Sequence, residues 1–468
     1  MEKLYDLIVA GGGGAGLCAA WSAMENGAKD VLILEAGKKT GGNSAAAGAF
    51  MYALETPQLA GSGKNTIQQE LREALTFHHF EFINPRLLRA WFEETSRSLA
   101  WIESRGRSFT LSPMGEGYTH LLDGSPGVGW FHTFLTPLSK ELEERGAEIR
   151  TRTRVTQMLT ENGRVVGVRA EDAQGETEYR AKAVLLSVGG FLQRTDLLEK
   201  YFPAYFNPDA YWSVVPSDGR GGEMAAQAGA QVKPECTLLK ESGLAFGTMK
   251  PGLPGRLFSL PGTVMINARG RRYVDESLWN QNYAANAMLN QPGKIGYALY
   301  SQGSLAHAMS GGGAGGAGSE DGGDLTALKA EAAKRELCIF ADTLDEVAQW
   351  IGADPAVLAK TVADYNGYCA IGEDRELAKP ADQLIPLDCG PWLCVKVFPM
   401  YIDTIGPVCV DEALHVLDEN DRPIPGFYAA GVLAAGWQGR DYMRFGSALS
   451  FAVSSGRIAG RTIAAELQ

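Results

Sequence analysis

Three glycines near the start of the chain have the spacing of a phosphate-binding turn. Gly11, Gly13 and Gly16 follow the apolar run 7–10 and precede an alanine-rich stretch with the composition of a helix. Glycine at these positions permits a tight turn, lets a pyrophosphate approach the backbone and lets the helix pack closely on the strand. The helix start would direct N–H groups and the positive end of its dipole at the phosphates. Glu35, at the end of the next apolar run, can accept hydrogen bonds from a ribose. We predict a dinucleotide site here and favour it over a purely structural glycine loop.

A second glycine-rich segment follows Glu35. It holds four glycines within residues 37–48, with Asn and Ser between them. Such a loop can run close to a ligand, because glycine leaves room for it. A plain NAD domain has no need of this loop, whereas a flavin has a ring that extends beyond its ADP half. The segment therefore favours a flavin.

With these motifs the sequence resembles the flavoprotein family of fumarate reductase, the succinate dehydrogenase flavoprotein subunit, tricarballylate dehydrogenase and the 3-ketosteroid dehydrogenases. The ketosteroid and tricarballylate dehydrogenase-like branches are the nearest. The resemblance implies an α/β fold, α+β overall, in which a Rossmann-like FAD-binding domain is split by an inserted α+β cap domain. It places the two parts of the FAD-binding domain at 1–235 and 398–468 and the cap at 236–397. The FAD would be noncovalent, because the segment 41–48 lacks the histidine of the covalently flavinylated relatives.

The resemblance also implies which residues contact FAD. The segment 41–48 would lie along the flavin, Val155 matches the adenine side, and Asp218 would lie near the flavin side unless it is a plain helix cap. The last helix would begin near the pyrimidine edge of the flavin, where its dipole favours the negative charge of the reduced ring. The full predicted set is Gly11, Gly13, Gly14, Ala15, Gly16, Glu35, Ala36, Gly42, Asn43, Ser44, Gly48, Val155, Gly189, Asp218, Gly431, Val432, Ala448 and Leu449.

Tyr442 and Gly446 match a Tyr-x-x-x-Gly pattern that the ketosteroid dehydrogenases carry before their last helix. In those enzymes the phenol and the glycine N–H hold the carbonyl oxygen of the substrate. Two donors on one oxygen stabilise an enolate and can contribute several kcal/mol in a dry site. The resemblance therefore gives Tyr442 and Gly446 catalytic roles, with a structural tyrosine at a turn as the alternative.

Three positions depart from the fumarate reductases. The cap-domain arginine that acts as their acid falls on Asn280, and the histidine before their T-M-G-G segment falls on Asp403. Their substrate-binding arginine is matched by Arg444 only with a shift of one position. We therefore do not expect plain fumarate reduction.

The proton-exchanging residue is not in its expected place. The cap tyrosine of the ketosteroid dehydrogenases also falls on Asn280, and Tyr283, one helical turn later, is a candidate substitute or else a core or interface aromatic. Arg444 would bind a carboxylate or phenolate if it faces the flavin. A neutral ketone is favoured if Arg444 faces solvent.

The patterns of apolar residues predict the elements that position these groups. Strands are expected where short apolar runs end in glycine or in an acid, and helices where apolar residues recur with helical spacing. Expected strands are 7–10, 31–34, 164–169, 181–188 and 425–432, with a strand, turn and strand over 265–276. Expected helices follow Gly16 and cover 66–106 with a break at Pro85, 131–145, 343–351, 355–365 and the C-terminal stretch from 442, and 310–323 is expected to be a solvated loop.

The composition excludes several classes of function. The chain has 468 residues, a net charge of −12 and no Lys/Arg block, which argues against binding to nucleic acid or to an anionic membrane surface. Seven scattered cysteines without a C-x-x-C argue against zinc, haem or iron–sulfur sites, so no metal is predicted, and an odd number fits reduced thiols. With the first strand close to Met1 and no apolar run of membrane-spanning length, we expect a cytoplasmic protein.

The predicted activity is that of an FAD-dependent ene reductase or dehydrogenase that exchanges hydride between flavin N5 and a CH–CH or C=C bond next to a carbonyl. A ketosteroid-like or other cyclic enone or ketone is the expected small-molecule substrate. The alternative is an unsaturated di- or tricarboxylate bound by Arg444. An electron-transfer subunit would need a partner protein, and a flavin-binding scaffold would show no turnover. The sequence fixes neither the direction of the reaction nor the electron donor or acceptor.

Overall fold

The computed structural model describes residues 3–114, 117–124, 131–208, 210–212, 217–233, 236–244, 262–278, 281–310 and 325–468. The chain divides into two compact units. Unit 1 comprises Met1–Phe202, Val214–Leu239 and Asp403–Gln468, and unit 2 comprises Pro203–Ser213 and Lys240–Ile402. The separate division predicted from the sequence, with a cap domain over 236–397, stays a prediction.

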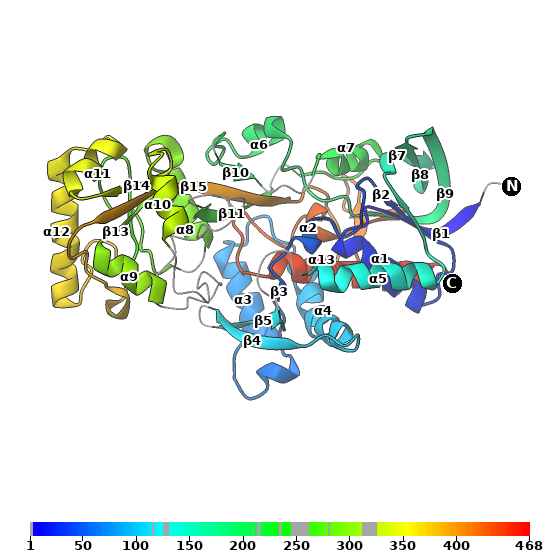
Figure 1. Cartoon of the computed structure of the whole chain (residues 1–468). Helices are drawn as coiled ribbons and strands as arrows, with labels where there is room; N and C mark the ends of the chain where they lie inside the picture. Colours follow the sequence, from blue (N-terminus) through cyan, green and yellow to red (C-terminus); the bar gives the residue numbers. More distant parts are fainter. Residues whose placement is uncertain are drawn as a thin grey trace. The chain divides into compact units, whose positions relative to one another are not determined.

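The central element of unit 1 is a sheet with the strand order β16-β17-β9-β1-β2-β6 (Figure 1). The pairs from β17 to β6 are all parallel. Apolar runs such as Val31–Leu34 are buried completely, as expected for strands covered on both faces. The strands are β1 Leu4–Ala10, β2 Val31–Glu35, β6 Glu148–Thr151, β9 Gly175–Leu186, β16 His415–Leu417 and β17 Pro423–Ala429.

A β-meander leads into this sheet. β7 (Arg154–Glu161) pairs antiparallel with β8 (Arg164–Asp172), and β8 pairs antiparallel with the first part of β9. The second part of β9 then runs parallel to β1. The fold class predicted from the sequence is confirmed by this sheet and by the antiparallel sheet of unit 2.

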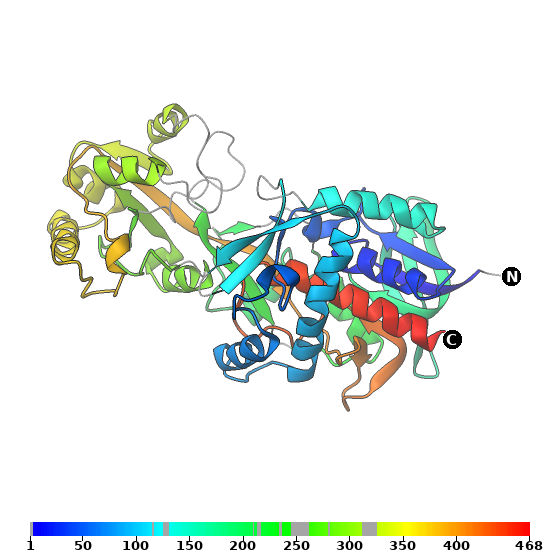
Figure 2. The same ribbon diagram turned by 90° about the horizontal axis from the view of Figure 1, so that it is seen from below.

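Helices from the two ends of the chain pack side by side in unit 1. α1 (Gly14–Glu25, blue) and α13 (Ser447–Glu466, red) are in contact along their length (Figure 2). A Cβ atom at Gly456 of α13 would collide with the backbone oxygen of Ala15, so a small residue is required at this crossing. The sequence places Gly and Ala there, and this lets the final helix reach the start of the first one.

The rest of unit 1 surrounds this helix pair. The helices α3 and α4 confirm the prediction of a break at Pro85, since Asn84 caps α4 by accepting from the N–H groups of Arg86 and Leu87. The remaining elements are α2 Gly42–Ala45, α3 Ile67–Phe77, α4 Pro85–Glu103, α5 His132–Glu144, α6 Thr195–Tyr201 and α7 Arg220–Gln227, with a small sheet of β3 Phe50–Met51, β4 Phe109–Met114 and β5 Gly117–Leu122.

Unit 2 is built on a second, mostly antiparallel sheet around β15. Its strands are β10 Tyr211–Trp212, β11 Thr237–Leu244, β12 Val264–Ile266, β13 Gly296–Tyr300, β14 Cys338–Ala341 and β15 Trp392–Ile405. Its helices are α8 Gln281–Leu289, α9 Gln302–Ser310, α10 Thr326–Ala332, α11 Leu344–Ile351 and α12 Pro355–Ile371. Most of the predicted loop at 310–323 lies outside the described residues.

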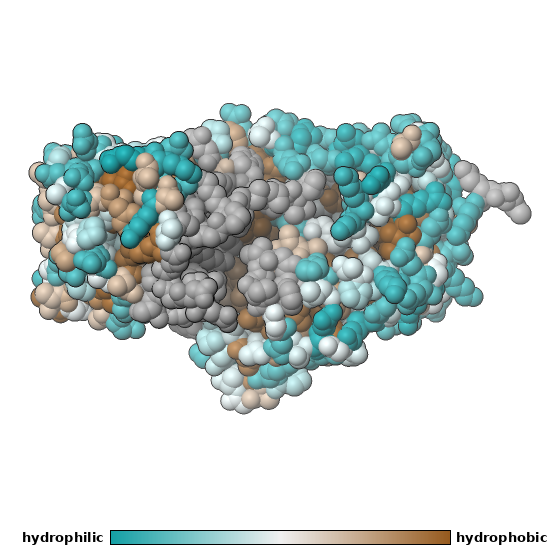
Figure 3. Space-filling model, viewed as in Figure 1, coloured by the Kyte–Doolittle hydropathy of each residue, from teal (hydrophilic) through white to brown (hydrophobic). Residues whose placement is uncertain are grey.

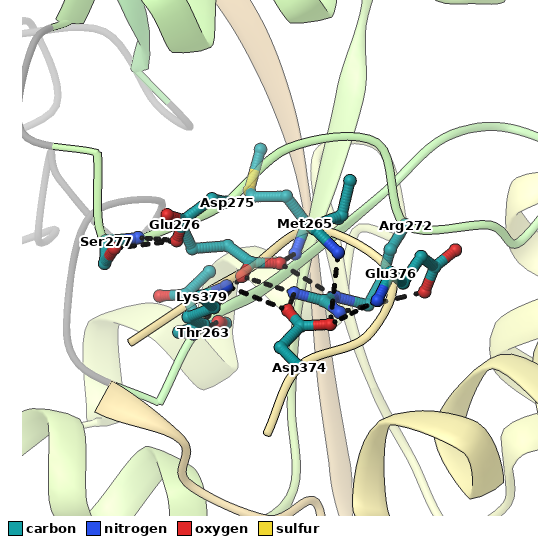
Figure 4. A network of polar contacts seen from close by, with 10 residues as sticks. Thr263, Met265, Arg272, Asp275, Glu276, Ser277, Asp374, Glu376 and Lys379 are labelled. Atoms are coloured by element: carbon teal, nitrogen blue, oxygen red, sulfur yellow. Dashed lines mark hydrogen bonds and ion pairs between the residues drawn. The ribbon is translucent and has the colours of Figure 1, made fainter. Parts of the chain in front are cut away.

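A buried network of charged side chains joins three segments of unit 2 (Figure 4). Arg272 donates to Glu276 at 3.1 Å and to Asp374 at 2.9 Å, and Lys379 lies 3.2 Å from Glu276. The side chains of these four residues are at most 3% exposed. Two cations thus balance two anions inside the unit, and the loop that carries Asp374 is tied to the segment after β12.

The same network explains an error in the predicted elements. The second strand expected within 265–276 is reduced to one bridge, between Ile266 and Arg272. The chain turns at Asn267, whose side chain accepts from the N–H groups of Arg269 and Arg271. Arg272 then enters the buried network, so charge pairing overrides the strand pattern.

Candidate active site

The phosphate-binding turn lies between β1 and α1, as predicted. Gly11 has a φ of 102°, and a Cβ atom there would lie 2.5 Å from the backbone oxygen of Ser187, so only glycine fits. Gly13 is the N-cap of α1 and makes no side-chain cap, and an added Cβ would meet no atom within 4 Å. The backbone at the N-cap of α1 therefore has open space beside it, which leaves room for a pyrophosphate at the start of the helix.

Glu35 is held beside this turn at the end of β2. Its Oε2 accepts from the N–H of Gly12 at 2.8 Å, and its Oε1 accepts from the N–H of Gly37 at 2.6 Å. A carboxylate has about four acceptor positions, so both oxygens can still accept from hydroxyl groups of a ribose. The residues of the turn and of Ala36 thus fit the ADP half of FAD.

The segment predicted to follow the flavin lies next to the turn. Gly41 donates its N–H to the oxygen of Gly12 at 2.8 Å, and α2 begins directly after it. A Cβ atom on Gly14 would lie 2.5 Å from Ser44 Oγ. The predicted residues Gly42, Asn43 and Ser44 therefore meet the start of α1, and Gly48 follows just before β3.

The C-terminal part of the predicted set joins the same place. Gly431 donates its N–H to Ser455 Oγ of α13 at 3.0 Å, and a Cβ atom on Gly431 would lie 3.0 Å from the Cβ of Ala15. Val432 follows Gly431, while Ala448 and Leu449 lie in the first turn of α13. Residues from both ends of the chain thus surround one site, which the distance along the sequence does not reveal.

Three further predicted contacts lie outside these segments. Val155 is buried in β7, which begins beside β2, where Thr153 donates its N–H to the oxygen of Glu35 at 2.9 Å. Asp218 forms ion pairs with Arg154 and, at 3.6 Å, with Arg220. Its Oδ1 also accepts from the N–H of Arg220, the first residue of α7, at 3.4 Å, and no described contact joins its side chain to the turn. Gly189 lies in the segment after β9 with a φ of 85°.

Tyr442 is buried beside the first turn of α13. Its phenol oxygen accepts a hydrogen bond from the N–H of Ala448 at 2.7 Å. Gly446 has a φ of 82° and is the N-cap of the helix. The positive end of the α13 dipole therefore lies at this phenol.

Arg444 is bound by two carboxylates of α3. Its guanidinium donates to Glu70 at 3.2 Å and lies 2.5 Å from Glu73, and its side chain is 16% exposed. Tyr52 also donates its hydroxyl hydrogen to Glu70. Sequence reasoning missed this acidic pair, Glu70 and Glu73, because acids one turn apart on an amphipathic helix are usually solvated. Glu70 is instead buried, with its side chain 4% exposed, and both acids face Arg444, which precedes α13.

Asp403 is a second group that the sequence did not single out for a role. It is 3% exposed, and its carboxyl group accepts from Asn43 Nδ2 at 2.7 Å and from the N–H of Thr404 at 2.8 Å. Burial raises the pKa of Asp403 to about 6, against the opposing effect of these two hydrogen bonds. A proton can therefore reside on this group near neutral pH.

In unit 2, Tyr283 lies in α8 and is 40% exposed. Asn280, which replaces the expected acid, lies outside the described residues. Lys240 of β11 is fully buried, with its ammonium 4.1 Å from the centre of the Tyr205 ring. No signal in the sequence distinguishes this lysine from an exposed one.

The described residues contain no cluster of three or more His, Cys, Asp or Glu that could hold a metal ion. Among the helices of the described chain, none is long and apolar enough to cross a membrane. On the face shown in Figure 3, hydrophobic residues form separate small patches among hydrophilic ones.

A family model described as FAD binding domain matches residues 6–442. The chain belongs to this family, that of the fumarate reductase and succinate dehydrogenase flavoproteins. It is 28% identical over 481 residues to the vinyl phenol reductase of Lactiplantibacillus plantarum, with 98% of this chain and 96% of that protein covered. It is 27% identical over 473 residues to the probable fumarate reductase Ifc3 of Shewanella frigidimarina, with 98% and 74% covered.

Among solved structures, the 3-ketosteroid Δ1-dehydrogenase of Sterolibacterium denitrificans matches with a TM-score of 0.80 at 21% identity, covering 99% of this chain and all of that one. This similarity supports the fold. The predictions of a flavoprotein of this family and of an FAD-dependent oxidoreductase that acts on CH–CH bonds are confirmed. The protein is thus an FAD-dependent oxidoreductase that reduces C=C bonds or dehydrogenates CH–CH bonds, with a small-molecule substrate and an electron donor or acceptor.

Proposed function

We propose that the substrate of this flavoprotein is an uncharged cyclic enone, ketone or phenol whose C=C or CH–CH bond is conjugated to the oxygen-bearing carbon. The observation that carries the proposal is the engagement of Arg444 by Glu70 and Glu73. The FAD is proposed to be noncovalent, because the segment 41–48 has no histidine.

The acidic pair removes the charge that a carboxylate substrate would need. A free arginine binds a carboxylate through two parallel hydrogen bonds. Here one guanidinium already faces two carboxylates, at 3.2 Å and 2.5 Å. An incoming carboxylate would meet a cluster with no net positive charge, and would have to displace an existing ion pair. A substrate without a carboxylate avoids this cost.

Tyr442 is proposed to bind the substrate oxygen. Because the N–H of Ala448 donates to the phenol oxygen, the phenol acts there as acceptor and directs its own hydrogen to another oxygen. The dipole of α13 favours negative charge beside Tyr442 and Gly446. Negative charge accumulates on the substrate oxygen as hydride adds to the conjugated carbon or, in the reverse direction, as the proton leaves the neighbouring carbon, so this position stabilises the enolate or phenolate form.

The bound FAD would supply hydride exchange, and the chain's own residues do the rest. The α1 turn, Glu35 and α2 hold and orient the cofactor, and Tyr442 with Gly446 orients the substrate oxygen. The proton on the neighbouring carbon is exchanged by a cap residue, for which Tyr283 stays the candidate.

The similarity to vinyl phenol reductase supports a neutral or phenolic substrate, and it covers nearly all of both chains. A second candidate function, reduction of an unsaturated carboxylate, is favoured by the similarity to the probable fumarate reductase Ifc3. The two candidates differ in the charge of the substrate and are separated by the same assay.

The test uses the FAD-loaded protein, reduced without oxygen and mixed with cyclic enones, vinyl phenols or fumarate. We expect reoxidation of the flavin by members of the first two groups. Tyr442→Phe should slow reoxidation about 10²- to 10³-fold, the usual cost of one oxyanion donor, while FAD stays bound. The matched control is Tyr179→Phe in β9. It removes a phenol oxygen that accepts a hydrogen bond from Arg150. Equal rates in both variants would exclude the role of Tyr442, and reoxidation by fumarate alone would favour the second candidate.

A further inference from the structure

Asp403 lies where three segments of unit 1 meet. It belongs to the last part of β15, accepts from Asn43 of α2 at 2.7 Å and accepts from the backbone N–H of Thr404 at 2.8 Å. A Cβ atom on Gly190 would lie 2.7 Å from Asp403 Oδ1, so the chain after β9 also packs against the carboxyl group. The group is therefore enclosed by α2, by the segment after β9 and by its own backbone.

Among the described residues, the groups that donate hydrogen bonds to Asp403 carry no charge. Its donors are a side-chain amide and a backbone N–H, and within the described part of the chain no Lys, Arg or His lies within ion-pair distance of it. Glu94, another buried carboxylate of unit 1, is instead paired with Arg457 and Arg461 at 3.2 Å and 2.7 Å. An ionised carboxylate without a cation is costly in such a place, so the neutral form is stabilised.

The position of Asp403 connects it to the cofactor site. Asn43, its donor, is the central residue of the segment predicted to lie along the flavin, and Ser44 beside it meets the start of α1. The segment after β9 follows a strand that ends at the same edge of the parallel sheet as β1. In doubly wound sheets this carboxyl edge is where ligands bind. The residues present thus fit a cofactor within electrostatic reach of Asp403.

We propose that Asp403, held by Asn43, binds and releases one proton in step with the redox state of the FAD. Asp403 takes up a solvent proton at a carboxylate oxygen as the cofactor gains two electrons from its reductant, and it releases that proton as the two electrons leave. Asp403 thereby makes the reduction of the flavin depend on pH and shifts the reduction potential of the flavin.

The physical reason is mutual repulsion of two negative charges. Reduction brings negative charge onto the flavin, and an ionised Asp403 nearby would oppose it, so protonation of the carboxylate relieves the cost. By linkage, the factor by which reduction raises the proton affinity of Asp403 equals the factor by which protonation favours reduction. We expect about a tenfold increase in proton affinity, as for charges about 12 Å apart in a medium of effective dielectric ~20, so that at most about half of the molecules take up the proton on reduction at a given pH.

The first measurement is a pH titration of the oxidised, FAD-loaded protein between pH 4.5 and 8, followed through the flavin absorption band. The wild-type protein should show a spectral transition with a midpoint of about 6. Asp403→Asn should lack it. The second measurement is the flavin potential across the same range, which in the wild type should fall more steeply with pH over about the first pH unit above the midpoint and regain its former slope beyond it. Ionisation of the reduced flavin itself makes the potential depend less steeply on pH. The flavin and Asp403 therefore change the slope of the potential against pH in opposite directions.

The matched control is Glu466→Gln, which removes a carboxylate at the far end of α13, about 30 Å from its first turn at 1.5 Å per residue. The Glu466→Gln variant should keep both the spectral transition and the pH dependence of the flavin potential. If Asp403→Asn does not retain FAD, Asp403→Glu keeps a carboxyl group and should show a displaced transition. The proposal fails if the wild type shows no transition in this range, or if Asp403→Asn shows the same transition as the wild type. Neither measurement uses a substrate, so the proposed substrate class does not affect the outcome.

Discussion

Neutralising one member of the acidic pair should restore carboxylate binding. Glu73 Oε2 lies 2.5 Å from Arg444 Nη2, and the Glu73 side chain is 49% exposed. Two unit charges about 4 Å apart interact by ~4 kcal/mol at an effective dielectric of ~20 and by ~1 kcal/mol in water. Because Glu73 is half exposed, the lower part of this range applies. Glu73→Gln should therefore strengthen the binding of a carboxylate near Arg444 by about 1.4 kcal/mol, which is about tenfold.

The assay is a titration of the oxidised, FAD-loaded protein with a carboxylate ligand and with an uncharged analogue, followed through the flavin spectrum. The affinity for the uncharged analogue should not change in Glu73→Gln. The control is Glu81→Gln, which removes an exposed glutamate that pairs with Arg440 at 3.0 Å. Added salt should reduce the gain, because an exposed charge is screened. Equal carboxylate affinity in the two variants would refute the assignment of Glu73 as a barrier to carboxylates.

Two predictions concern stability. The carboxylates of Asp411 and Glu466 accept hydrogen bonds from the protonated ring of His415, and these bonds, first that to Asp411 and then that to Glu466, raise the pKa of His415 to about 9 from 6.5. Protonated His415 therefore stabilises the folded protein fully below about pH 6.5. This contribution is lost as the pH rises through about 9, and the loss is about 2 kcal/mol after allowance for screening by solvent. Thermal melts of the wild type should show this loss and His415→Gln should not. Glu276→Gln should cost about 3–5 kcal/mol in chemical denaturation, because it leaves Arg272 and its neighbours with an uncompensated buried cation.

Two outcomes would contradict the stability predictions for His415 and Glu276. If His415→Gln keeps the same loss of stability between pH 6.5 and 9, another group is responsible. If Glu276→Gln unfolds at the same denaturant concentration as the wild type, Glu276 does not compensate the buried cations of the network. Glu373→Gln, which removes an exposed partner of Arg375 at 3.2 Å, should change stability by no more than about 0.5 kcal/mol.

The sequence predicted those parts of the site that local chemistry determines. The turn from Gly11 to Gly16 can be recognised because its glycines have a fixed spacing between an apolar run and a helix. Glu35 follows from its place at the end of β2. The break before α4 follows from Asn84 and Pro85, which together start a helix.

Contacts between distant segments could not be predicted in this way. Glu70 and Arg444 are 374 residues apart, and nothing along the chain indicates that they meet. Asp403 is recognisable in the sequence only as a substitution for histidine, since its burial depends on α2 and on the chain after β9. At Arg272 the sequence pattern itself was misleading. The pattern predicts a strand, but the side chain of Arg272 enters a buried network of ion pairs with Asp374.

The central claim is that the site favours an uncharged substrate oxygen bound at Tyr442. The most direct test compares cyclohex-2-enone with 4-oxocyclohex-2-ene-1-carboxylate, which share the ring and the enone and differ by one carboxylate. The kcat/KM for reoxidation of the reduced protein should be higher for the uncharged enone, and the preference should shrink in Glu73→Gln. A higher kcat/KM for the carboxylate in the wild type would contradict the account.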